Sequence, residues 1–170
     1  TILHKSDVGG VALGLGDPGA VRDAFEAIRR RLEALGRLHE MQGVVVQQMA
    51  AGGVETFIGV TSDPGFGRLL GFGIGGVNVE LWRDVVFRVH PITDADARQM
   101  VEQIRGVKLL QGFRGQPPAD RDAIVDALLR VDRMLADLPQ LRELDINLLL
   151  ARAPGKGAIA LDARIRVHNG

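Results

Sequence analysis

The sequence has no cysteine, no tyrosine and a single tryptophan among its 170 residues. Without cysteine the chain can form no disulfide framework, no thiolate metal site and no thiol nucleophile, and we expect a protein of the reducing cytoplasm. The six phenylalanines are too few for the stacking surfaces that bind single-stranded nucleic acids. The 22 glycines favour instead a binding site in which the protein backbone lies close to the ligand.

An excess of charge of either sign is also missing, since 21 Lys and Arg balance 21 Asp and Glu. No broad field therefore attracts nucleic acid or an anionic bilayer, and any anion must be held locally. No apolar run approaches the roughly 18 residues of a membrane span. We expect a globular protein with no nucleic-acid and no membrane partner.

Periodicity and capping residues predict helices and strands in alternation. Asp17 and Pro18 form an N-cap followed by proline at the first helical position. The predicted helices cover residues 18–35, 93–105 and 120–138, and the predicted strands cover 11–15, 44–46, 55–60, 77–82, 85–89, 144–150 and 159–167. The glycine-dense stretch 71–76 either brings backbone amides to an anion or forms a closely packed strand corner. The strands predict a mainly antiparallel sheet.

The last two predicted strands give the strongest evidence for a site. A turn centred between Pro154 and Gly155 sets Asn147 opposite Asp162, whereas a slip of one residue would oppose apolar to polar side chains. In that register Asp145, Asn147, Asp162 and Arg164 converge on one face. Oxygen ligands of this kind suit Mg²⁺. The same pattern is that of an amphipathic hairpin whose polar face only meets solvent, and alternation alone favours that interpretation.

Sequence motifs favour the Mg²⁺ site over a polar face that only meets solvent. The segments 143–148 (ELDINL) and 161–165 (LDARI) resemble the ELDINPL and DARI signatures of the ADP-forming acyl-CoA synthetase branch of the ATP-grasp superfamily. Upstream of these two segments, further blocks resemble the same family and occur in the same order as in it. They lie at residues 4–11, 46–49, 55–59, 63–67, 72–76, 84–88 and 112–120. The resemblance therefore covers nearly the whole chain.

The resemblance implies an α+β ATP-grasp fold, with mixed or antiparallel sheets and flanking helices, that holds Mg-ATP between two lobes. Residues 1–49 would form part of the first lobe, left incomplete, and residues 50–170 the second lobe with the terminal hairpin. The implied reaction joins a carboxylic acid to coenzyme A, with conversion of ATP to ADP and phosphate through a phosphohistidine. The acid and coenzyme A would bind on other domains, the coenzyme A-binding and phosphohistidine domains of an oligomeric enzyme.

The resemblance also assigns roles to residues, with ATP and Mg²⁺ as cofactors. Asp145, Asn147 and Asp162 look like the Mg²⁺ ligands, and Arg164 would face the phosphates. The remaining candidates are Val46, Gln47 and Met49, whose backbone would meet adenine, Glu55 near the nucleotide, Lys5 and Arg88 near the phosphates, and His4 as a phosphate relay.

Four of these further candidates also have a simpler interpretation. Val46 and Met49 also suit a strand core, His4 an ordinary surface position, and Arg88 a salt bridge on a strand. Imidazole can nevertheless accept and return a phosphoryl group near neutral pH, because its neutral form is nucleophilic.

Three departures from the family pattern are visible. Leu148 replaces a proline, Arg68 stands where a proline often follows Phe-Gly, and an upstream strand with another phosphate-binding lysine is absent. We therefore expect that the natural polypeptide extends upstream and that the isolated chain does not turn over.

Two rival functions match parts of the sequence. The stretch 14–19 (GLGDPG) matches the dinucleotide-binding fingerprint, but no acid ends a following strand about 20 residues later. The second rival is a synthetase-like regulatory domain fused to a protein acetyltransferase, which senses a ligand without ligase turnover. Neighbouring domains would separate this rival from the synthetase.

Overall fold

The computed structural model describes residues 9–76 and 84–167. The chain divides into two compact units, residues 1–51 and residues 52–170. Among the described residues, no helix has the length and the apolar character needed to cross a membrane.

In the first unit, residues 9–51 contain the long helix α1 (Pro18–Ala34), followed by the short 3₁₀ helix η1 (Leu38–Glu40). The side chain of Asp17 accepts a hydrogen bond from the Ala20 amide at 2.9 Å, as expected for an N-cap followed by proline. This helix confirms the prediction for residues 18–35. The strands predicted at 11–15 and 44–46 are wrong, because both segments are irregular and Val45 is 83% exposed. β-branched residues stabilise a strand only when neighbouring strands pack against them.

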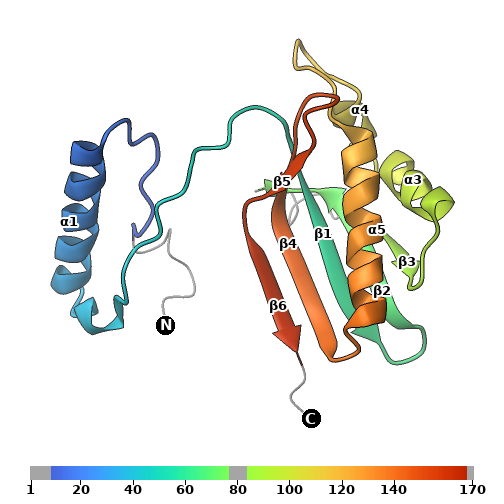
Figure 1. Cartoon of the computed structure of the whole chain (residues 1–170), viewed down its shortest axis with the longest axis horizontal. Helices are drawn as coiled ribbons and strands as arrows, with labels where there is room; N and C mark the ends of the chain where they lie inside the picture. The colour runs from blue at the N-terminus through green and yellow to red at the C-terminus, as the bar shows by residue number, and fades with distance from the viewer. Residues whose placement is uncertain (1–8, 77–83, 168–170) are drawn as a thin grey trace. The chain divides into compact units, whose positions relative to one another are not determined.

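The second unit is built on one antiparallel sheet (Figure 1). Its strands follow the order β3-β2-β1-β4-β5, and β6 also pairs with β4. Their bounds are β1 Val54–Asp63, β2 Gly67–Ile74, β3 Val85–Val89, β4 Leu141–Ala151, β5 Ala158–Ala160 and β6 Ala163–Val167. The antiparallel sheet was predicted, but β2 was not, because its glycines hide the strand pattern. The strand predicted at 77–82 lies outside the described residues, and the one at 159–167 is divided into β5 and β6.

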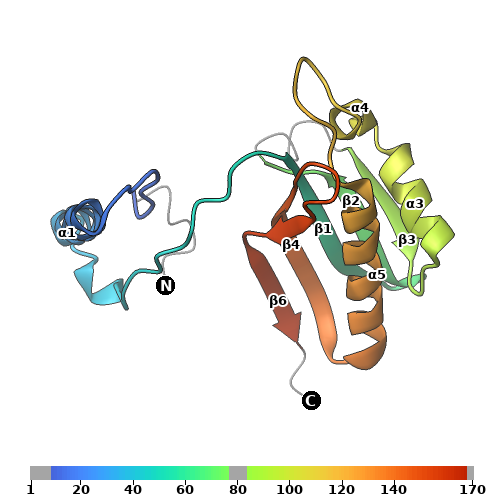
Figure 2. The same cartoon turned by 45° about the horizontal axis from the view of Figure 1, so that its top comes forward.

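The described residues of this unit include three helices, α3 (Asp94–Gln103), α4 (Val107–Leu110) and α5 (Arg121–Asp137). Figures 1 and 2 show α3 and α5 on the same face of the sheet. Beneath them lies the core, with Leu70, Phe72 and Leu128 all 0% exposed. The predictions at 93–105 and 120–138 identify α3 and α5, whereas the single turn of α4 was not predicted. We call the face under α3 and α5 the covered face and the opposite one the open face.

Arg68 fixes the C-terminal end of α5 to the sheet. Its guanidinium donates to the carbonyl oxygens of Leu135 and Pro139, both at 2.6 Å. The last carbonyls of a helix lack partners within the helix, and a cation there also complements the helix dipole. Arg68, at a position where the resembled family often has proline, therefore has a structural role in this chain.

Glycine in β2 allows phenylalanine rings to lie close to the sheet. A Cβ at Gly73 would come within 2.6 Å of the Phe57 ring and 2.3 Å of the Asp84 carbonyl oxygen. A Cβ at Gly71 would lie 2.8 Å from the Phe87 ring. Gly71 and Gly73 are therefore needed for close packing. Of the two interpretations of the glycine-dense stretch 71–76, this agrees with the closely packed strand.

Candidate functional site

The alternation of burial in β1 decides which side chains share the open face. Thr56, Ile58 and Val60 are buried at 0, 0 and 4% exposure, and therefore point to the covered face. The residues between them point the other way, because successive side chains of a strand alternate. Gly59 pairs with Asp145, and Asp145 pairs with Arg164. One cross-strand row of the open face thus contains a glycine, a carboxylate and a guanidinium.

The terminal hairpin has the predicted register. Asp145 is opposite Arg164 and Ile146 is opposite Ala163. Two residues further along β4, the Asn147 amide donates to the carbonyl oxygen of Asp162 at 3.1 Å. The turn is closed by a hydrogen bond from the Lys156 amide to the Ala153 carbonyl at 2.9 Å. Asp145 and Arg164 therefore share one row of the open face, and Asn147 is opposite Asp162 at the adjacent position, where the pairing of β4 with β1 is irregular.

These four side chains are exposed to solvent and only loosely engaged with each other. Arg164 Nε lies 4.0 Å from Asp162 Oδ2, and their side chains are 64% and 56% exposed. Within residues 9–76 and 84–167, no group of three or more His, Cys, Asp or Glu side chains could hold a metal alone. Two carboxylates and an amide do fit Mg²⁺, which takes one or two carboxylates and completes its octahedron with water and phosphate oxygens.

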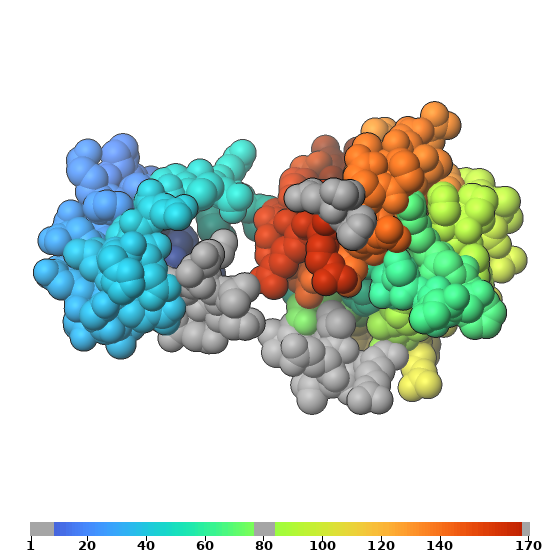
Figure 3. Space-filling model, turned by 90° about the horizontal axis from the view of Figure 1, so that it is seen from below, coloured from blue at the N-terminus to red at the C-terminus, as the bar shows by residue number. Residues whose placement is uncertain are grey.

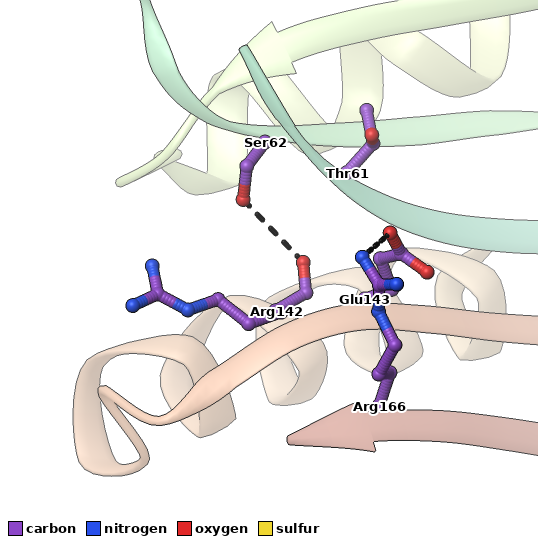
Figure 4. Close-up of a pocket in the computed structure, with 5 residues that line it drawn as sticks. All are labelled: Thr61, Ser62, Arg142, Glu143 and Arg166. Carbon is purple, nitrogen blue, oxygen red and sulfur yellow. Dashed lines mark hydrogen bonds and ion pairs between the residues drawn. The ribbon is translucent and has the colours of Figure 1, made fainter. Parts of the chain in front are cut away.

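A polar hollow adjoins this set, at the end of the open face where β1 finishes (Figure 4). It measures about 410 Å³ and is lined by Thr61, Ser62, Arg142, Glu143 and Arg166. Arg166 forms an ion pair with Glu143, and the Ser62 hydroxyl donates to the Arg142 carbonyl at 3.4 Å. Figure 3 shows β6, in red, on the surface of the second unit. Sequence reasoning missed this hollow, although alternation along β4 and β6 extends the same face to Glu143 and Arg166.

Glu55 lies at the opposite end of the same face. It is exposed near the start of β1 and lines a second hollow, also of about 410 Å³. The walls of this hollow come from the start of β1, the end of β2 and the loop after α4, including Ile74, Phe113, Arg114 and Pro118. The sequence marked 112–118 as a loop and as a family block, but did not indicate that Arg114 lies in one hollow with Glu55.

Arg88 does not join this group. It pairs with Leu70, a fully buried residue of the covered face, and its guanidinium donates to Gln103 of α3 at 2.5 Å. A strand side chain reaches only one face of a sheet, so Arg88 is directed towards α3. Its assignment to the phosphates finds no support in the position of this side chain.

The remaining candidates lie in the first unit. Val46 and Met49 are 65% and 56% exposed in an irregular segment, so neither forms a strand core in that unit. Gln47 lies in the same segment and is also exposed. Main-chain recognition of adenine by residues 46–49 stays a prediction. His4 and Lys5 lie outside the described residues.

Comparisons with known proteins agree with this architecture. A family model described as "ATP-grasp domain" matches residues 1–167. The beta subunit of ADP-forming acetate–CoA ligase II from Pyrococcus furiosus is 42% identical over 165 residues, which cover 96% of this chain and 70% of that subunit. The ADP-forming 4-hydroxybutyrate–CoA ligase of Nitrosopumilus maritimus is 39% identical over 164 residues. The matched residues make up 96% of this chain but only 24% of the length of that ligase.

A solved structure shows the same fold at high similarity. It is acetyl-coenzyme A synthetase 1 of Ca. Korarchaeum cryptofilum in complex with coenzyme A and Mg-AMPPCP, with its phosphohistidine segment pointing towards the nucleotide-binding site. The identity is 40% and the TM-score 0.86, over 99% of this chain and 72% of that one. The sheet, the helices on one face and the hairpin are thus those of a known architecture. The chain therefore belongs to the ATP-grasp family, in the branch that contains the beta subunits of ADP-forming acetate–CoA ligases.

Proposed function

We propose that the chain binds Mg-ATP for a larger ADP-forming acyl-CoA synthetase. The observation that carries this proposal is the register of the terminal hairpin, which sets Asp145 opposite Arg164 and Asn147 opposite Asp162. Its relatives are named as ADP-forming acid–CoA ligases, and a structural neighbour was solved with Mg-AMPPCP. The whole enzyme would convert a carboxylic acid, coenzyme A and ATP into acyl-CoA, ADP and phosphate.

Each open-face side chain has a distinct role in this proposal. The oxygens of Asp145, Asn147 and Asp162 would hold Mg²⁺, which neutralises charge on the phosphate oxygens when bound. Arg164 contributes a permanently charged planar guanidinium, which can donate two parallel hydrogen bonds to a phosphate. Its separation of 4.0 Å from Asp162 leaves the guanidinium available to such a ligand. Positioning and charge stabilisation are the main protein contributions to phosphoryl transfer.

A histidine would carry the phosphoryl group between ATP and the acyl substrate. His4 stays our candidate for a relay position within this chain, with Lys5 beside it. The partners of this chain would be the coenzyme A-binding and phosphohistidine domains of the same enzyme, on the same or a separate polypeptide. We further propose that the enzyme is an oligomer of the cytoplasm.

The test is the substitution Asp162→Ala in the enzyme that contains this chain. We expect Mg²⁺-dependent phosphorylation of the enzyme by ATP to be abolished, because one charged oxygen ligand is lost from a set of three. The readout is incorporation of ³²P from labelled ATP, measured over a range of Mg²⁺ concentrations. Thermal unfolding of the same preparation shows whether the variant is folded.

Asp137→Ala provides a matched control. Asp137 is an equally exposed acid, 54% against 56% for Asp162, and it pairs with Arg133 on α5, away from the open face. This variant should phosphorylate as the unchanged enzyme does. Phosphorylation close to the unchanged level in Asp162→Ala would reject the proposed ligand role.

A further inference from the structure

A β-bulge in β4 adds an arginine to the polar hollow at the end of the open face. The pairing of β4 with β6 shifts register between Leu141 and Glu143, which leaves Arg142 as an extra residue. Leu141 and Leu144 are both buried, at 1% and 3% exposure, although residues three apart in a regular strand point to opposite faces. Counted from Leu144, alternation would turn Arg142 towards the core. The bulge instead leaves Arg142 exposed beside Glu143, where both line the hollow.

The polar hollow combines positive charge with hydrogen-bond donors that are not in use. The Arg142 guanidinium has no hydrogen-bond or ion-pair partner among the described residues, and neither does the Thr61 hydroxyl. Ser62 is weakly engaged, because its bond of 3.4 Å to the Arg142 carbonyl is long for a hydroxyl donor. Arg166 pairs with Glu143, so the two guanidinium groups of the hollow exceed its one carboxylate. The hollow therefore favours an anion.

The donors of the hollow suit a tetrahedral oxyanion. A guanidinium can donate two parallel hydrogen bonds to the oxygens of a phosphate, and each hydroxyl can donate one more. Figure 4 shows the Arg142 side chain on one side of the hollow and the pair of Arg166 and Glu143 on the other. Exposed side chains change rotamer within nanoseconds, so Arg142 can close over an anion that enters. Four oxygens can use donors from both sides, whereas the two oxygens of a carboxylate cannot.

The hollow lies one row away from the proposed nucleotide site. Glu143 pairs with Arg166, and Asp145 pairs with Arg164 in the neighbouring row. Neighbouring rows of one face are two residues apart, or about 7 Å along a strand. This separation is shorter than the Debye length of about 8 Å at physiological ionic strength, so solvent ions do not fully screen charges in the two rows from each other.

We propose that the polar hollow binds free inorganic phosphate and that this phosphate weakens the binding of Mg-ATP in the neighbouring row; the second half of the inference rests on the proposed function. Two anions about 7 Å apart repel each other. Coupling between two ligands is reciprocal, so Mg-ATP also weakens phosphate. Phosphate is a product of the proposed reaction. The hollow therefore lowers nucleotide affinity when phosphate accumulates.

The experiment uses two variants with opposite expected effects. The 170-residue chain is titrated calorimetrically with inorganic phosphate at constant ionic strength. We expect Arg142→Gln to weaken phosphate binding about fivefold, because it removes the unpaired guanidinium. Glu143→Gln should strengthen phosphate binding about threefold, because it removes the carboxylate of the hollow and releases Arg166 from its ion pair. A variant that only disturbed the fold would weaken binding in both cases.

Arg105→Gln provides a matched control. Arg105 is an exposed arginine between α3 and α4, and it lines neither of the two hollows. This variant should bind phosphate as the unchanged chain does. The inference is overturned if Arg142→Gln binds phosphate as tightly as the unchanged chain, if both variants of the hollow weaken binding, or if the unchanged chain binds no phosphate.

Titration of Mg-ATP with and without saturating phosphate tests the coupling. Phosphate should lower the Mg-ATP affinity of the unchanged chain about threefold, and that of Arg142→Gln by less. Complete mutual exclusion would mean that the hollow holds the terminal phosphate of the nucleotide, which rejects the inference but not the proposed function.

The variant Asp162→Ala separates the failure of the inference from that of the proposed function. It should lose Mg-ATP while its phosphate affinity stays unchanged, because Asp162 does not line the hollow. A chain that binds phosphate but not Mg-ATP would support the phosphate site and reject both the proposed function and the coupling.

Discussion

The two faces of the sheet impose opposite requirements on the same strands. In β4, Leu144 is 3% exposed beneath the helices, while its neighbour Asp145 is exposed on the open face. In β1, Ile58 is completely buried and the next residue, Gly59, lies beside Asp145. The covered face provides the packing that stabilises the unit. The open face has few apolar contacts to lose, so its polar residues are free to serve a ligand.

Substitution of two consecutive residues offers the sharpest test of this comparison. We expect Leu144→Ala to lower the free energy of unfolding by about 2–5 kcal/mol, because it leaves a cavity in the core. Asp145→Ala should change that free energy by only about 0.5 kcal/mol, as exposed substitutions generally do. Its affinity for Mg-ATP should instead fall by about tenfold or more. Urea unfolding and calorimetric titration measure the two quantities.

The opposite pattern would break the comparison. If Asp145→Ala unfolds as readily as Leu144→Ala, the open face contributes to stability as the covered face does. If Leu144→Ala loses nucleotide affinity in its folded fraction, the two faces are not energetically separate.

A smaller effect is expected at Asp120, where the covering helix α5 is joined to the β4–β5 turn. The Asp120 carboxylate accepts hydrogen bonds from the amides of Gly157, at 2.9 Å, and Ala123, at 3.1 Å. These bonds, the one from Gly157 first, hold the pKa of Asp120 below its ordinary value of 3.8. A carboxylate with a lowered folded pKa stabilises the protein above its ordinary pKa, and this contribution is lost as the pH falls through the folded pKa.

Asp120→Asn should therefore reduce stability by about 0.3–1 kcal/mol at pH 7, because the charge is lost while an acceptor remains. Below pH 3.8 the difference from the unchanged chain should close. Urea unfolding at a series of pH values provides the measurement. A difference that persists at the lowest pH would show that the charge of Asp120 is not its cause.

The smallest effect is expected at the ion pair between Arg166 and Glu143 on the open face. Both side chains are at least half exposed, at 69% and 50%. Exposed pairs of this kind contribute about 0–1 kcal/mol, and salt screens them. Arg166→Ala should therefore change the unfolding midpoint in urea only slightly, and less still in high salt. A loss as large as that of Leu144→Ala would show that the open face holds the fold together.

The covered face was largely predictable from the sequence. The apolar periodicity of α5 and the Thr93 cap of α3 are local signals, and the structure confirms both helices. The strands at 11–15 and 44–46 were wrong because β-branched residues do not form a strand without a neighbour. β2 was missed because Gly71 and Gly73 serve ring packing from β1 and β3, which no local pattern reveals.

The open face was predictable only where alternation fixes the register. The hairpin placed Asp145 and Asp162 correctly, because a one-residue slip would have exposed its apolar side chains. Arg88 was different, since two strands separate β3 from β4 and the face that Arg88 occupies depends on pairing with the unpredicted β2. The closeness of Arg114 and Glu55 depends on the packing of a loop against distant strands, which the sequence does not show.

The pairing of β6 with β4 sets both the position and the direction of Arg164. Because neighbouring positions of a strand alternate in direction, a slip of β6 by one residue against β4 would turn Arg164 under the sheet and bring Ala163 or Ile165 out in its place. A slip of two residues would preserve the direction of Arg164 but would move it away from Asp145.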